Sequence, residues 1–355
     1  MLEPGRVSVA AMLAFTRDAL LAHGLPVADA ELAAKQMIEA DLTGFDAHGI
    51  MRLGNYCNWI KSGRVNPKPN IRVLQRSPAT ALVDGDDGIG HLVMTYATNL
   101  AIELARGSGV AWVGAHNSNH AGAAGIYPAM AAELGMVGIY AAVSTMNHMG
   151  LWGGAEALLG TNPIAIAIPA GKEAPVVLDI ATSVSSFGTI RQHLARDEPL
   201  QEGWVVHSKT GKPITDPKKV NEGVLLPIGG HKGSGLALMI GLLAGVLNGA
   251  AFGRDVVDPS APGNGATNTG QLIVVVDVSR FIAPDVFAAE MDRHLKDLAS
   301  SPTLPGFDSI RLPGADRRKR RADRGANGVP LPAPLLKQLD ELAARLKLQP
   351  LGERT

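Results

Sequence analysis

His48 and Arg52 are the first side chains in this 355-residue sequence whose types and spacing could do chemistry. They are four residues apart, so on one helical turn they would share a face. An arginine can bind a carboxylate through two parallel hydrogen bonds, and an imidazole gains or loses a proton near neutral pH. Together they could bind a 2-oxo acid and handle the proton of its oxygen. A solvated helix face would carry the same pair, so the pair alone decides nothing.

His120 is a second candidate, because it lies in a polar segment, 116–120, that follows a predicted apolar strand at 110–115. Loops that follow strands commonly carry the active-site residues of α/β proteins. His116 and His120 also have a spacing that could bind zinc. No glutamate directly follows His116 and no cysteine cluster supplies further ligands, so we expect no metal.

Small polar residues gather at two further strand ends and could contact a bulky polar ligand. Gly160-Thr161-Asn162-Pro163 precedes one apolar strand, and a second strand ends in Asp179-Ile180-Ala181-Thr182-Ser183. Glycine lets the backbone approach a ligand, while hydroxyl and amide groups offer it hydrogen bonds. Ordinary turn chemistry would account for either segment by itself.

A glycine-rich turn at 229–235 leads into a long apolar segment and contains His231, Lys232 and Gly233. A helix N-terminus binds anions, and the ammonium of Lys232 adds positive charge. The turn lacks the GxxxxGK[ST] spacing of a Walker A loop. The chain also has no convincing GxGxxG between a strand and a helix, so its motifs do not support a conventional Rossmann site.

Taken together, these segments resemble the malate/L-lactate dehydrogenase family that is unrelated to the Rossmann lactate dehydrogenases. Its members include malate, sulfolactate and ureidoglycolate dehydrogenases, diketogulonate reductase and cyclic imino-acid reductases. The matching segments follow the family's order and cover roughly residues 40 to 330. They are His48-Gly49-x-x-Arg52, Ser118-Asn119-His120-x-Gly122, Trp152-Gly153-Gly154, Gly160-Thr161-Asn162-Pro163, Asp179-x-Ala181-Thr182-Ser183, Lys232-Gly233-Ser234-Gly235-Leu236 and Pro313-Gly314.

The resemblance implies a mixed-sheet α/β/α cofactor domain of the sulfolactate-dehydrogenase type, flanked by helical segments from both chain ends, in a homodimer. It implies that His120 and His48 lie at the reacting carbon and that Arg52 holds the substrate carboxylate. It also implies NAD or NADP as the cofactor. The residues expected to bind this cofactor are Ser144, Thr161, Asn162, Asp179, Ile180, Ala181, Thr182, His231, Lys232, Gly233, Pro313 and Gly314.

The chain departs from the family pattern in two places. Before Trp152, where an Ala-Pro pair is common, it has Asn147-His148-Met149-Gly150-Leu151, which bears on the substrate. After Pro313-Gly314, where a glutamate is usual, Ala315-Asp316 leads into the basic run Arg317-Arg318-Lys319-Arg320-Arg321. NADP differs from NAD by a 2′-phosphate that arginine or lysine can bind. We therefore expect NADPH to be accepted at least as well as NADH, although a solvated tail is the usual fate of such a run.

Apolar periodicity and capping residues predict the elements that position these side chains. Strands alternate with helices after a helical start, which predicts α/β layering. Residues 1–75 are expected to form a helical segment carrying His48 and Arg52, 76–284 an α/β NAD(P)-binding domain, and 285–355 a segment packing on the N-terminal helices. Helices are predicted at 8–24, 29–42, 46–61, 95–107, 125–134, 233–251, 284–298 and 333–347. Strands are predicted in two pieces within 71–84 and at 110–115, 137–144, 164–168, 176–180 and 272–277, with 316–324 in a breaker-rich tail.

The composition favours a cytoplasmic protein without nucleic-acid or membrane partners. Lys and Arg number 33 and so do Asp and Glu, so no net field attracts polyanions or an anionic membrane. A single cysteine, Cys57, cannot form an intramolecular disulfide, and charged residues interrupt the start of the chain where a secretory signal would be apolar. The uncharged segment 233–251 approaches the length of a membrane span, but its glycines favour a buried core helix.

The sequence as a whole predicts an NAD(P)-dependent oxidoreductase that transfers hydride between nicotinamide and C2 of a small 2-hydroxy or 2-oxo acid. Its substrate would be a small carboxylate similar to malate or lactate. A reductase of a cyclic imino acid is the main alternative within the same family. A metal-dependent hydrolase using His116 and His120 and a non-catalytic binding protein of the same fold are less favoured.

Overall fold

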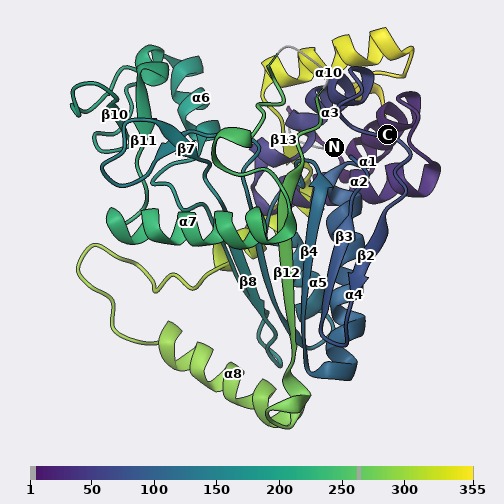
Figure 1. Ribbon diagram of the computed structural model, residues 1–355, viewed down its shortest axis with the longest axis vertical. Coiled ribbons are helices and arrows are strands. Elements are labelled where there is room, and N and C mark those ends of the chain that lie inside the picture. Colours follow the sequence, from purple (N-terminus) through teal and green to yellow (C-terminus); the bar gives the residue numbers. More distant parts are fainter. Residues whose placement is uncertain (1–4, 262–264, 355) are drawn as a thin grey trace.

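The computed structural model describes residues 5–261 and 265–354, which form three layers of helix and sheet (Figure 1). The helices are α1 (Val9–Ala22), α2 (Val27–Thr43), α3 (Leu53–Lys61), α4 (Gly90–Ser108), α5 (Ile126–Ala132), α6 (Phe187–Arg196), α7 (His231–Ala244), α8 (Pro284–Ala299), α9 (Ala315–Asn327) and α10 (Ala333–Leu346). The strands are β1 (Arg6–Val7), β2 (Arg72–Arg76), β3 (Thr80–Asp84), β4 (Val110–Ser118), β5 (Met136–Ala142), β6 (Met149–Gly150), β7 (Ala157–Leu159), β8 (Ile164–Ile168), β9 (Val176–Ile180), β10 (Val205–His207), β11 (Gly223–Leu225), β12 (Thr269–Asp277) and β13 (Val329–Pro330).

The central sheet of the described residues has seven strands in the order β2-β3-β4-β12-β5-β8-β9. Only β3 and β4 run parallel; the other neighbours are antiparallel. Alternating side chains of β12 face opposite sides, as a strand requires. Ile273 and Val275 pack with α4 and α5, whereas Leu272 packs with Ala244 at the end of α7. Helices therefore cover both faces, and the predicted mixed α/β layering is confirmed.

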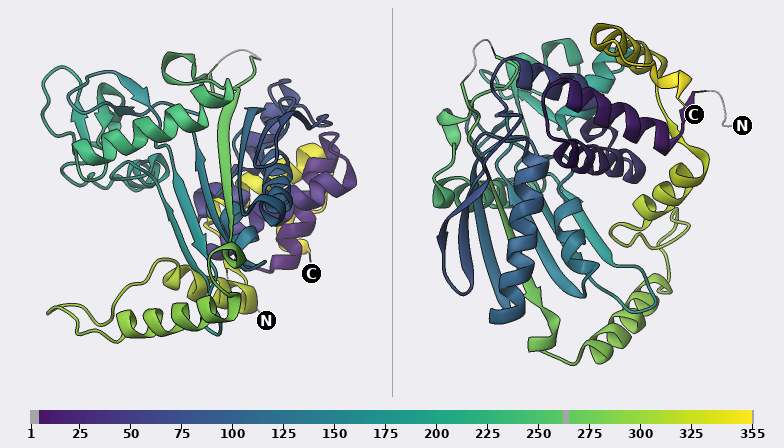
Figure 2. Two further views of the ribbon diagram at one scale, coloured as in Figure 1. Left: turned by 60° about the horizontal axis from the view of Figure 1, so that its bottom comes forward. Right: turned by 90° about the vertical axis from the view of Figure 1, so that its right-hand side faces the viewer.

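Helices from both chain ends form a second core beside this sheet (Figures 1 and 2). Ser8 caps α1, because its side-chain oxygen accepts a hydrogen bond from the backbone N–H of Ala11. Apolar residues of α1, α2, α3 and α10 form one buried cluster, and β1 pairs with β13 from the far end of the chain. This cluster carries the segment that contains His48 and Arg52.

A third core lies under a small sheet of order β10-β11-β6-β7, within the range expected to form one α/β domain. It includes Met149, Leu159 and Ile190, and α6 packs against it. The short strands and α6 were not predicted, although Ser186 caps α6 and apolar residues recur along it at helical spacing. This unit places Phe187 and its neighbours opposite the helical end of the molecule.

Several predicted elements differ from the structure. The basic run, expected in a tail, forms α9, since Arg321 and Arg324 pair with Glu39 and Asp46 from the N-terminal segment. The 19-residue apolar segment is helical only through Ala244 and continues as a short 3-10 turn. It is not buried all round, because Met239 and Leu247 are exposed. No helix among the described residues is long and apolar enough to cross a membrane.

A further difference concerns the helix predicted from Asp46 to Lys61, which carries the first candidate pair. The structure has two 3-10 turns, Asp46–His48 and Ile50–Arg52, before α3 begins at Leu53. Helix α2 begins at Val27, two residues before the start predicted at Asp29, which therefore lies in the first turn of the helix.

Candidate active site

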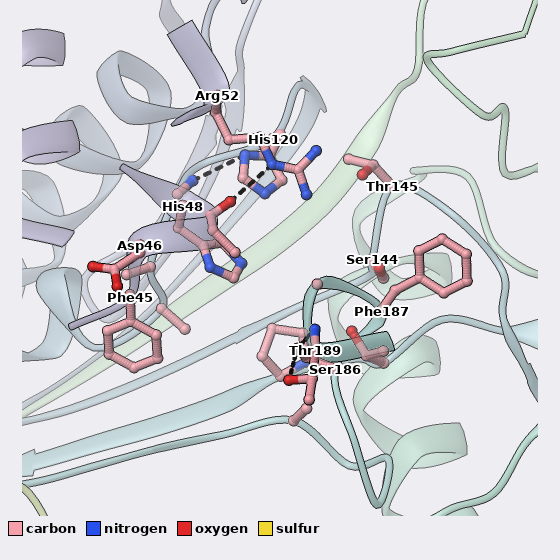
Figure 3. Close-up of a pocket in the computed structure, with 18 of the residues that line it drawn as sticks. Phe45, Asp46, His48, Arg52, His120, Ser144, Thr145, Ser186, Phe187 and Thr189 are labelled. Atoms are coloured by element: carbon pink, nitrogen blue, oxygen red, sulfur yellow. Dashed lines mark hydrogen bonds between the residues drawn. The ribbon is translucent and has the colours of Figure 1, made fainter. Parts of the chain in front are cut away.

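A cavity of about 730 Å³ lies where the three cores meet. Its walls come from the turns at 44–52, the loop at 120–124, the segment 144–148, the start of α6 and one face of α9. Figure 3 shows His48, Arg52 and His120 on one side of this cavity, with Ser144, Phe187 and Thr189 across from them. The structure thus brings together the three residues predicted to be catalytic.

Gly49 explains why His48 and Arg52 share the cavity without sharing an α-helix. A Cβ at this position would lie 2.1 Å from Oδ1 of Asp41, a buried residue of α2. Oδ2 of Asp41 accepts a hydrogen bond of 2.8 Å from the N–H of Ile50, which fixes the second turn. The tight approach requires glycine and orients both side chains inward.

We expect Gly49→Ala to lower kcat/KM by roughly 10- to 100-fold with the fold retained, because small displacements of positioning groups are costly. The matched control is Gly54→Ala on α3, where an added Cβ meets no atom within 4 Å. Steady-state kinetics and thermal unfolding of both variants check this. Equal kinetics for the two variants would show that the Asp41 contact does not position the site.

Arg52 presents a free guanidinium edge to the cavity. Its Nε donates to the carbonyl oxygen of Ala47 at 2.9 Å, which fixes the side chain and leaves the two terminal nitrogens available. Within residues 5–261 and 265–354, no ion pair to Arg52 is formed. Burial lowers the pKa of Arg52, yet a guanidinium stays protonated at neutral pH. Arg52 can therefore bind a carboxylate through both nitrogens.

Two donors determine which nitrogen of His120 carries the proton. The backbone N–H of Gly122 lies 3.3 Å from Nδ1 of His120, and the Tyr56 hydroxyl lies 2.5 Å from the same atom. A backbone N–H can only donate, so Nδ1 is an acceptor, and the neutral ring carries its proton on Nε2. His120 consequently offers a hydrogen-bond donor to a ligand in the cavity.

His48 and His120 are both neutral at pH 7. Their rings stack at a centroid distance of 5.5 Å. Burial, followed by the charges of Arg52 and Arg317, lowers the pKa of His48 to about 4. Burial and the nearby Arg52, His48 and His91 hold the pKa of His120 well below its usual value. Neither imidazole is protonated at pH 7, so each can act as a neutral hydrogen-bond donor or acceptor.

Tyr56 is a functional candidate that the sequence reasoning missed. It is fully buried on α3 and forms the hydrogen bond to His120 described above. Its position four residues after Arg52 was a usable signal, since the series 48, 52 and 56 repeats at helical spacing.

The predicted cofactor residues divide into three groups. Ser144, Thr161, Asp179 and Ala181 line the cavity. Asn162 and Thr182 are fully buried, and their side chains form hydrogen bonds within the fold, to Ser144, Thr161 and Ala237. The remaining residues lie outside the cavity lining and stay predictions. They are Ile180, His231, Lys232, Gly233, Pro313 and Gly314.

Asp179 and Arg317 form the boundary between the cavity and α9. Oδ2 of Asp179 accepts from the N–H of Gly125 at 2.7 Å and lies 3.6 Å from Nη1 of Arg317. The Arg317 guanidinium lies 3.6 Å from the ring centroid of Phe45. Burial raises the pKa of Asp179 to about 6, while Arg317 acts to lower it. Arg317, Arg320 and Arg324 all line the cavity, so α9 makes this wall cationic.

His116 and His120 do not share a metal site in the described part of the chain. His116 does not line the cavity and lies near Gly249. No group of three or more His, Cys, Asp or Glu side chains suited to a metal occurs among the described residues.

Comparison with known proteins identifies relatives over nearly the whole chain. The sequence model of the family described as malate/L-lactate dehydrogenase matches residues 7–340. Malate dehydrogenase of Pyrococcus horikoshii is 36% identical over 352 residues, covering 97% of this chain and 96% of that protein. A solved structure of malate dehydrogenase from Pyrococcus horikoshii OT3 has a TM-score of 0.89 and 35% identity, with 99% and 98% of the two chains covered.

Two further relatives act on other substrates. The ureidoglycolate dehydrogenase (NAD(+)) of Escherichia coli K12 is 32% identical over 306 residues, or 86% of each chain. The structure of delta1-piperideine-2-carboxylate reductase from Pseudomonas syringae pvar. tomato has a TM-score of 0.84 and 31% identity, covering 95% of this chain and 99% of that one. The fold predicted from the sequence is the fold of these solved structures.

Proposed function

The chain belongs to the malate/L-lactate dehydrogenase family and is an oxidoreductase that acts on a hydroxy acid, and we propose that it transfers hydride between a nicotinamide cofactor and C2 of a small 2-oxo acid. The observation that carries the proposal is the arrangement of Arg52 and His120. An unpaired guanidinium and a neutral imidazole with its proton on Nε2 face one cavity. The first fits a carboxylate, and the second fits the adjacent carbonyl oxygen.

The cationic wall of α9 fits a dinucleotide. Nη1 of Arg317 is buried and forms no hydrogen bond, and Arg320 lines the same wall without an acidic partner in the described chain. Guanidinium groups suit phosphate oxygens. Thr161 and Ser144 line the same cavity, where they would contact the rest of the cofactor. A bound nicotinamide supplies the hydride donor or acceptor.

The protein's own residues supply orientation and the proton. Arg52 holds the C1 carboxylate, so that C2 and its oxygen face His120 and His48. The Nε2–H of His120 donates to the C2 oxygen and passes its proton to that oxygen as negative charge develops there. The Tyr56 hydroxyl moves its proton to Nδ1 in the same step, so the ring does not become an anion. Burial raises the pKa of Tyr56 and the charge of Arg52 only partly opposes this, so the tyrosinate is short-lived and regains a proton before the next turnover.

The proposal is tested with a panel of 2-oxo acids and cyclic imino acids, each assayed with NADH and NADPH by the loss of nicotinamide absorbance. We expect 2-oxo acids to be reduced and the activity to survive a metal chelator. A cyclic imino acid is the second candidate substrate, because the Pseudomonas syringae relative is named as a reductase of one. Inertness toward the whole panel with both cofactors would contradict the proposal.

We propose NADPH as a cofactor accepted at least as well as NADH, with Arg320 as the contact for the 2′-phosphate. Arg320→Ala should raise the KM for NADPH by roughly tenfold and leave that for NADH unchanged, because only NADPH has the extra charge. Arg318→Ala is the control, since Arg318 donates to the carbonyl of Pro175 and does not line the cavity. A wild type that strongly prefers NADH, or an unchanged KM for NADPH in the variant, would remove this assignment.

We also propose that the protein is a cytoplasmic homodimer that buries the exposed side of α7. Apolar residues lie exposed along this helix and the turn after it at helical spacing, which is unusual for a surface that meets only water. They are Leu236, Met239, Leu243, Val246 and Leu247. A second copy of the chain could bury these residues against its own copy of the same helix.

The double variant Met239→Glu/Leu243→Glu should shift the mass measured by light scattering from dimer to monomer, because four buried carboxylates in one interface are strongly unfavourable. Leu134→Glu is the control, because Leu134 is also an exposed apolar residue but does not belong to α7. A monomeric wild type, or a double variant that remains dimeric, would show that α7 is not the interface.

A further inference from the structure

The cavity contains a guanidinium that neither the reaction at C2 nor the proposed cofactor wall of α9 uses. Arg191, on α6, lines the same cavity as Arg52 but comes from the opposite unit of the fold. No ion pair to Arg191 is formed within the described residues. The two cations disfavour one another, and Arg191 contributes to lowering the pKa of Arg52. An unneutralised pair of cations in one concave site favours a ligand with two negative groups.

The side chain of Arg191 is exposed and packs against an aromatic ring at the cavity wall. Its guanidinium carbon lies 5.2 Å from the ring centroid of Phe187, one helical turn earlier on α6. The ring of His148 stacks on Phe187 at 4.0 Å with an interplanar angle of 4°. Figure 3 shows Phe187 and Thr189 across the cavity from His48 and Arg52. Arg191 is therefore held on the far wall and not beside the C1 carboxylate.

Among the described residues that line this far wall, Arg191 is the one that carries a charge. Burial, together with the charge of Arg191, lowers the pKa of His148 to about 4, so the imidazole is neutral at pH 7. The negative charge of Asp258 acts to raise the pKa of His148 and only partly opposes this shift. Its carboxylate accepts from the N–H of Ser260 and forms no ion pair with Arg191 in the described chain. His148 belongs to the segment in which this sequence departs from the family pattern.

We propose that Arg191 binds a second anionic group of the substrate, at the end opposite the carboxylate held by Arg52. The inference rests on the proposed reduction at C2 and narrows its substrate class. The favoured substrates are 2-oxo acids with a carboxylate or sulfonate at the far end, and Phe187 and His148 keep Arg191 in place to select them. Monocarboxylic 2-oxo acids of the same length lack the group that Arg191 binds.

The test compares oxaloacetate with 2-oxobutyrate, which have the same carbon number and differ in the distal carboxylate. Arg191→Ala should lower kcat/KM for oxaloacetate by roughly 10- to 100-fold, the range for losing a charge-assisted hydrogen bond. The value for 2-oxobutyrate and the KM for the cofactor should stay within about twofold, since neither uses Arg191. Arg196→Ala is the matched control, on the same helix but outside the cavity lining and beside Glu198.

Each other outcome overturns the subsite. An equal loss of kcat/KM with both acids would mean that Arg191 binds a group the two acids share. A raised KM for the cofactor would mean that Arg191 binds a phosphate of the cofactor. If the wild type is active and Arg191→Ala has unchanged kinetics, Arg191 does not bind the substrate, although the proposed reaction is still supported. A wild type that reduces no 2-oxo acid would contradict the proposed function itself, and this inference with it.

Discussion

Replacing His120 with alanine lowers kcat by roughly 10²- to 10⁴-fold with the fold intact, if this side chain delivers the proton to the C2 oxygen. The loss should fall on kcat more than on KM, because the hydrogen bond strengthens as charge develops on that oxygen. His116→Ala is the matched control, four residues earlier and outside the cavity. Near wild-type turnover in His120→Ala would transfer the role to His48, and an equal loss in His116→Ala would revive a joint role for the two histidines.

The acid–base behaviour of the wild type gives a related expectation. Burial holds the pKa of His120 well below the usual 6.5, so the neutral ring persists through pH 7. A lowered pKa means that the neutral form is lost only as pH falls through the depressed value. We therefore expect kcat/KM for reduction to be flat around pH 7, without an inflection at 6.5, whereas Tyr56→Phe, which removes one donor to Nδ1, should change this profile.

Arg52→Lys should lower kcat/KM nearly as much as Arg52→Ala, by roughly 10²-fold. A guanidinium offers two parallel donors to a carboxylate, whereas an ammonium is a point charge and cannot reproduce the fork. The lysine would also lack the Nε donor that binds the carbonyl of Ala47 and fixes the side chain. Most of the loss should disappear for a substrate analogue without the C1 carboxylate. An unchanged kcat/KM in Arg52→Lys would show that Arg52 is only a charge at the cavity wall.

Local sequence patterns predicted the elements whose causes are local. The strands at 164–168 and 176–180 and the helix capped by Ser8 were predicted because continuous apolar runs and a capping side chain are readable within a few residues. The mixed α/β fold followed from the resemblance and from the alternation of these elements, and the solved relatives have it.

The errors come from side-chain contacts that the apolar periodicity does not encode. Spacing predicted His48 and Arg52 on one helix, but the carboxyl of Asp41 occupies the space beside Gly49 and imposes two 3-10 turns. The basic run becomes α9 because acids of α2 and its following turn pair with it, some 280 residues away along the chain. No short window of the sequence contains both members of the Arg321–Glu39 pair or of the Arg324–Asp46 pair.

The candidate site shows the same division. His48, Arg52 and His120 were found because their residue types are suited to chemistry. Tyr56 and Arg191 were missed, because their roles follow from their contacts in the fold. Tyr56 bonds to His120, and Arg191 lines the cavity from a helix that was not predicted. The positions of His231, Lys232 and the Pro313-Gly314 turn relative to a bound cofactor stay predictions.

The most direct test of the central claim is to follow the hydride itself. The wild-type enzyme is given oxaloacetate and a reduced nicotinamide cofactor deuterated at the transferred position of C4, and the product is examined by mass spectrometry and NMR. The account predicts a 2-hydroxy acid that carries the deuterium at C2, with the hydroxyl proton drawn from the protein and water. A reduced product without deuterium at C2, or no product from any 2-oxo acid of the panel, would contradict it.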